Sequence, residues 1–84
     1  MNPVEWLESA YAELADVYVS ATVEERERIA SAVDALNRRL ALDPDAGESR
    51  DGANRVVTVL PVTLRFRRTG SGVTVYHVHH VRAR

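Results

Sequence analysis

The sequence predicts an α+β fold in which a two-helix antiparallel hairpin packs on a twisted, mainly antiparallel sheet of three to four strands. Two observations predict this fold. Apolar residues in the first half of the chain recur at intervals of three and four, which is the period of a helix. From Val56 onward they alternate with polar residues, which is the period of a strand. With 84 residues available, we expect a single domain over residues 1–84 with a modest core.

Two helices are expected, near residues 5–20 and 23–42. Thr22 stands just before the second helix, and Glu25 is three positions after Thr22. This Thr-x-x-Glu pattern is a capping box, which marks a helix start. Because Pro44 disfavours helical backbone in the residue before it, the second helix should end just ahead of that proline. The connection between the helices is very short, so they are expected to run antiparallel.

Three strands are expected, near residues 54–60, 62–68 and 73–82, in one antiparallel sheet. The segment 43–53 is rich in Asp, Gly, Pro and Ser, which predicts a loop. The first residues, 1–5, fit either a short edge strand or an N-terminal extension. A proline at the third position is tolerated at a helix start or a sheet edge, but not in a central strand.

The middle predicted strand should have one apolar and one basic face, because successive side chains of a strand point to opposite sides. The apolar side chains are Val62, Leu64 and Phe66, and the alternating polar ones are Thr63, Arg65 and Arg67. The apolar face is expected to lie against the helices, so the arginines should point away from them. The residues expected to be buried together are Leu14, Ile29, Val33, Leu36, Leu64, Phe66 and Val75.

The last strand departs from simple alternation. Strict alternation would put Val78 on the opposite face from Val75. A β-bulge near residues 76–77 would bring both valines to the same side, whereas without a bulge the strand would be buried on both faces. If the bulge exists, we expect the strand to place His80 beside Arg65 on the basic face.

Charge is divided unevenly along the chain. Residues 1–48 hold eleven acidic residues and four arginines, a balance of −7, whereas residues 49–84 hold one acidic residue and seven arginines, a balance of +6. All basic residues are arginine, which binds phosphate and carboxylate groups through two hydrogen bonds at once. The clustering indicates a site for a polyanion or for an oppositely charged protein partner.

The composition also bears on location. There is no cysteine, which excludes disulfides and thiolate metal sites, and no apolar run is long enough for a transmembrane helix. Acidic residues near the start do not fit a signal peptide. These features favour a cytoplasmic protein that does not enter a membrane.

Several segments together resemble the RelE/ParE family of bacterial toxins. They are an acidic helical hairpin followed by LxxDPxxGxSR, then LPVTLRFRR, and finally VTVYHVHH. The resemblance covers nearly the whole chain and implies a small RelE/ParE-like domain with two helices on a twisted antiparallel sheet. It also implies a type II toxin–antitoxin system, in which a cognate antitoxin protein neutralises the toxin. One branch of the family cleaves mRNA on the ribosome and arrests translation and growth, and another inhibits DNA gyrase without cleaving nucleic acid.

The cleaving branch implies a set of basic and histidine side chains on the sheet that activate a ribose hydroxyl and stabilise charge on phosphate. On this resemblance, the catalytic residues are Arg65 and His80, with arginine for charge and histidine for proton transfer. The implied RNA-binding residues are Arg50, Arg55, Arg67, His79 and Arg82. Such an mRNA interferase would need no metal ion and no cofactor. His77 and His79 could face a metal together, but no third ligand has suitable spacing.

Three functions stay open at this point. The first is a ribosome-dependent mRNA endonuclease acting on ribosome and mRNA, and the second is a non-catalytic inhibitor of DNA gyrase. The third is a toxin-derived binding module without activity, in which Arg65 and Arg67 are ordinary surface residues and the histidines pack at a sheet edge.

Overall fold

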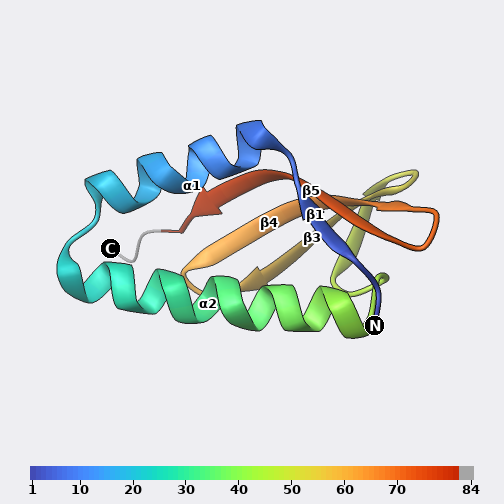
Figure 1. The fold of residues 1–84 in the computed structure, drawn as a ribbon, viewed down its shortest axis with the longest axis horizontal. Helices are drawn as coiled ribbons and strands as arrows, with labels where there is room; N and C mark the ends of the chain where they lie inside the picture. The colour runs from blue at the N-terminus through green and yellow to red at the C-terminus, as the bar shows by residue number, and fades with distance from the viewer. Residues whose placement is uncertain (82–84) are drawn as a thin grey trace.

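The computed structural model describes residues 1–81 and contains two helices and five strands (Figure 1). The helices are α1 (Glu8–Ser20) and α2 (Val23–Leu42). The strands are β1 (Val4–Trp6), β2 (Glu48–Asp51), β3 (Asn54–Val59), β4 (Val62–Thr69) and β5 (Gly72–His80). They form one sheet in the order β1-β5-β4-β3-β2. The predicted α+β class is confirmed, with five strands in place of three to four.

The two helices occupy the regions predicted for them. The capping box at the start of α2 is present, because the Thr22 hydroxyl accepts from the Glu25 backbone N–H and the Glu25 carboxylate accepts from the Thr22 backbone N–H. The helices run in opposite directions, with α1 along β5 and α2 across β3, β4 and β5 (Figure 1). Helix α1 begins at Glu8, later than predicted, because Val4–Trp6 form β1. Within residues 1–81, neither helix has an apolar stretch long enough to cross a membrane.

Two strands add to the three predicted ones, and one of them, β1, corresponds to the short edge strand that was one of the two alternatives for residues 1–5. Strand β1 pairs in parallel with β5, so the sheet is mixed at this edge, whereas the three predicted strands, β3, β4 and β5, pair antiparallel as expected. The pairing arises because the Val73 N–H donates to the Pro3 carbonyl and the Leu7 N–H donates to the Val75 carbonyl. Strand β2 lies inside the segment predicted to be a loop, where it pairs antiparallel with β3. Its residues are all exposed and polar, so no alternation of apolar side chains marks it.

The core lies between the helices and one face of the sheet. Of the seven residues expected to be buried, five are 0% exposed and two are partly buried against the hydrophobic core. The fully buried ones are Ile29, Leu36, Leu64, Phe66 and Val75, and the partly buried ones are Leu14 and Val33. The cross-strand register agrees, since Leu64 lies opposite both Val57 of β3 and Val78 of β5. The apolar face of β4 therefore lies against the helices, and its other face is open.

Candidate functional site

The open face of the sheet carries the arginines of β4. Arg65 and Arg67 alternate with buried Leu64 and Phe66, and both arginines are exposed. Within residues 1–81, the one hydrogen bond of the Arg67 side chain is a long one, 3.4 Å from its Nε to the Asn54 side-chain oxygen. Among residues 1–81, no hydrogen bond or ion pair engages the side chain of Arg65. Two guanidinium groups are thus available on this face for an anionic ligand.

A β-bulge decides which histidines reach this face. In the pairing of β4 with β5, Arg65 lies opposite His77 and Phe66 lies opposite Val75, so Tyr76 is the extra residue. The predicted bulge is therefore confirmed. Beyond it, His77 and His79 are both exposed, and their ring centroids are 5.9 Å apart. Because directly opposed residues in an antiparallel pair have neighbouring side chains, His77 stands next to Arg65.

The same bulge places His80 on the other side of the sheet, so the expectation that His80 joins Arg65 is wrong. A bulge that brings Val78 to the core face must also bring the residue two positions later to that face. His80 lies opposite buried Val62, and its side chain is only 8% exposed. The two residues expected to share catalysis therefore lie on opposite faces of β4 and β5.

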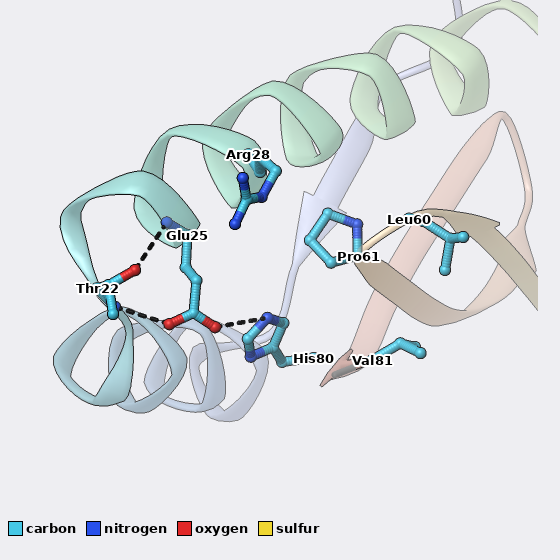
Figure 2. A pocket seen from close by; sticks show the side chains of 7 residues that line it. All are labelled: Thr22, Glu25, Arg28, Leu60, Pro61, His80 and Val81. Carbon is cyan, nitrogen blue, oxygen red and sulfur yellow. Dashed lines mark hydrogen bonds and ion pairs between the residues drawn. The ribbon is translucent and has the colours of Figure 1, made fainter. Parts of the chain in front are cut away.

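His80 instead lines a cleft of about 590 Å³ between α2 and the ends of the strands (Figure 2). The other lining residues are Thr22, Glu25, Arg28, Leu60, Pro61 and Val81. The His80 Nε2 faces the Glu25 carboxylate at 3.9 Å, while its buried Nδ1 has no hydrogen-bond partner within residues 1–81. Of the two ring nitrogens, Nε2 is the one that faces an acceptor, and at 3.9 Å this contact is longer than a hydrogen bond. Glu25 belongs to the capping box of α2, and the His80 side chain beside it is almost buried. His80 is therefore part of the packing between helix and sheet.

His77 has a partner that the sequence analysis missed. Glu13, on α1, lies against the part of β5 that β1 does not pair with. Its two carboxylate oxygens are 3.1 and 3.0 Å from the His77 Nδ1, and one of them accepts from the Val78 backbone N–H at 3.2 Å. The signal was weak because the two residues are 64 positions apart and belong to different types of element.

The other arginines predicted to bind RNA differ in whether the fold already engages their guanidinium groups. The Arg55 guanidinium donates to the backbone carbonyls of Asp45, Ala46 and Gly47, so it holds the loop before β2. Arg50 is exposed on β2, at the far end of the sheet from β5. Arg82 lies outside the described residues. Arg65, Arg67, His77 and His79 are consequently the group that the fold brings together on the open face.

Comparisons with known proteins bear on the fold. No protein-family model and no curated protein sequence matches the chain. Among solved structures, a chain described as "Chromosomal ParDE TA system from P. aeruginosa" superposes with a TM-score of 0.74 at 21% sequence identity, covering 98% of each chain. The two chains share a fold. The RelE/ParE-like fold expected from the sequence is thereby confirmed.

Proposed function

We propose that this chain is the toxin of a toxin–antitoxin pair and that its working surface is the open sheet face with Arg65 and His77. The fold shared with a chain of a ParDE system supports the toxin role and, with it, a cognate antitoxin as partner. The observation that carries the choice of surface is the direct pairing of exposed Arg65 with His77. A cation beside a histidine is a combination that can support RNA cleavage, through charge stabilisation and proton transfer.

The reaction that this geometry supports best is cleavage of mRNA on the ribosome. Arg65 and Arg67 would hold the scissile phosphate and stabilise its charge in the transition state. His77, in place of His80, would take the proton of the ribose 2′-hydroxyl as that oxygen attacks the phosphorus. His79 would donate a proton to the departing 5′-oxygen, so the two histidines divide acid and base roles. No metal ion takes part in this scheme.

Inhibition of DNA gyrase is the second candidate, and the similarity to a ParDE chain favours it. The resemblance noted in the sequence includes a branch that acts on gyrase without cleaving nucleic acid. In that case the arginines would bind the target through charge, and the histidines would not be needed for proton transfer.

Three variants separate these functions when toxicity is measured after induced expression in cells. Arg65→Ala is expected to abolish growth arrest in either case, whereas His77→Ala is expected to abolish it only if the protein cleaves RNA. Arg68→Ala is the matched control, because that guanidinium is already bound to the Asp45 carboxylate at 2.9–3.0 Å. Circular dichroism checks that each variant is folded.

Two assays with purified protein then identify the target. A cleaved mRNA and arrested translation in vitro, with normal gyrase supercoiling, would support the endonuclease. Inhibited supercoiling with normal translation would support the gyrase inhibitor and contradict the RNA-cleavage scheme. A protein that is not toxic and inhibits neither process would contradict both, leaving a binding module without activity.

A further inference from the structure

We propose that Glu13 is a positioning residue that fixes the tautomer of His77, so that its Nε2 acts as the proton acceptor on the open sheet face. This inference rests on the proposed RNA cleavage for its consequence, but the tautomer itself is independent of that function. The evidence is the contact between the Glu13 carboxylate and the His77 Nδ1, at 3.0 and 3.1 Å to its two oxygens.

An ionised carboxylate only accepts hydrogen bonds, so the nitrogen that faces Glu13 must carry the hydrogen. In a neutral imidazole one nitrogen donates and the other accepts, and the partner of one nitrogen determines which form is present. With Nδ1–H donating to Glu13, the lone pair of His77 is on Nε2. No other side chain of residues 1–81 engages this nitrogen, so it can take a proton from a ligand on the open face.

The position of Glu13 is itself held from two sides. Its Oε1 accepts a hydrogen bond from the Val78 backbone N–H, which lies beyond the residues of β5 that pair with β1. Helix α1 is anchored beside β5 by the bond from the Leu7 N–H to the Val75 carbonyl. The carboxylate is therefore fixed relative to the backbone of the strand that carries His77.

The exposure of the pair argues against a mainly stabilising role. The side chains of His77 and Glu13 are 48% and 36% exposed, and ion pairs at such exposure contribute little to stability. Orientation of an imidazole by a carboxylate, in contrast, has a large effect on proton transfer, because it fixes the tautomer and stabilises the imidazolium that forms.

In the proposed reaction the proton balance is complete. The 2′-hydroxyl proton passes to the His77 Nε2, the 2′-oxygen bonds to phosphorus, and the bond from phosphorus to the 5′-oxygen breaks. The 5′-oxygen takes a proton from the His79 imidazolium, leaving a 2′,3′-cyclic phosphate and a 5′-hydroxyl. Glu13 neither gains nor loses a proton, and nothing is oxidised or reduced.

The first test measures the tautomer of the neutral ring by ¹H–¹⁵N correlation NMR of the histidine side chains. The variants are Glu13→Gln and the control Asp16→Asn, which removes a charge from an exposed α1 residue that makes no hydrogen bond or ion pair within residues 1–81. We expect His77 of the wild type and of Asp16→Asn to carry its hydrogen on Nδ1, and Glu13→Gln to show a mixture of tautomers. A His77 spectrum that is the same in all three proteins would overturn the proposal.

The second test measures cleavage of a labelled mRNA on programmed ribosomes. Glu13→Gln is expected to lower kcat at least about tenfold with little change in KM, and Asp16→Asn to leave both unchanged. If Glu13→Gln alters the tautomer but cleaves as fast as the wild type, the positioning role is overturned while the proposed function stands. If the wild type cleaves no RNA, the proposed function fails and with it the catalytic role of Glu13, whereas the NMR result still decides the tautomer.

Discussion

Replacing Phe66 with alanine tests the assignment of the two sheet faces. Phe66 lies on the central strand β4, is 0% exposed and belongs to a cluster that includes residues of both helices. Losing a buried side chain of this size forfeits about 1.5–3 kcal/mol of transfer free energy. The cavity left between sheet and helices adds to this loss, so the total cost is expected to be about 3–5 kcal/mol.

This cost is large relative to the total free energy of unfolding of the protein. At roughly 0.05–0.15 kcal/mol per residue, 84 residues correspond to an unfolding free energy of about 4–13 kcal/mol. Urea unfolding followed by circular dichroism measures the loss. With a denaturant slope of about 1 kcal/mol per molar urea, the midpoint of Phe66→Ala should fall by about 3–5 M. At the lower end of the stability range, the variant would be marginally folded or unfolded without urea.

Two further variants calibrate this measurement. Leu36→Ala removes a side chain of α2 that is 0% exposed, and is expected to cost about 2–5 kcal/mol. Leu60→Ala removes one that is 71% exposed, in the turn between β3 and β4, and should cost less than about 0.5 kcal/mol. Losses below about 1 kcal/mol at both buried positions, or a loss at Leu60 equal to that at Phe66, would refute the assignment of the faces.

Thr22→Ala removes the hydroxyl of the capping box and should cost about 1 kcal/mol in the same unfolding assay; no measurable loss would show that the cap does not hold the start of α2. Gly47→Ala should cost about 1–3 kcal/mol, because Gly47 has a φ of 75° and an added Cβ would overlap the backbone of β3. Gly52→Ala, with a φ of 56° and no neighbouring atom within 4 Å, is its control, and an equal loss at both would exclude the overlap as the cause. Arg65→Ala should weaken binding of single-stranded RNA and reduce the slope of log K against log salt by about 0.7, whereas Arg68→Ala should change the slope less; the reverse order in filter-binding titrations would contradict the assignment of the RNA-binding face.

The local elements followed from short-range patterns. The capping box at Thr22 and the apolar stripe after it were enough to predict α2, because helical hydrogen bonds join residues close in sequence. The alternation around Leu64 and the irregular spacing of Val75 and Val78 likewise predicted two faces and a bulge. These predictions needed no knowledge of which elements meet.

The partners of each element were decided only by the tertiary structure. Strand β2 has no apolar alternation, so backbone pairing with β3 alone makes it a strand, and the parallel pairing of β1 with β5 joins distant segments. The contact of Glu13 with His77 depends on where α1 lies beside β5, which no local spacing encodes. The sequence alone therefore determined the helices, the long strands and the basic face of β4. The register of β5 on β4 decided which residue stands beside Arg65, because it makes Tyr76 the extra residue and so sets His77 opposite Arg65, while His80 shares the core face with Val78.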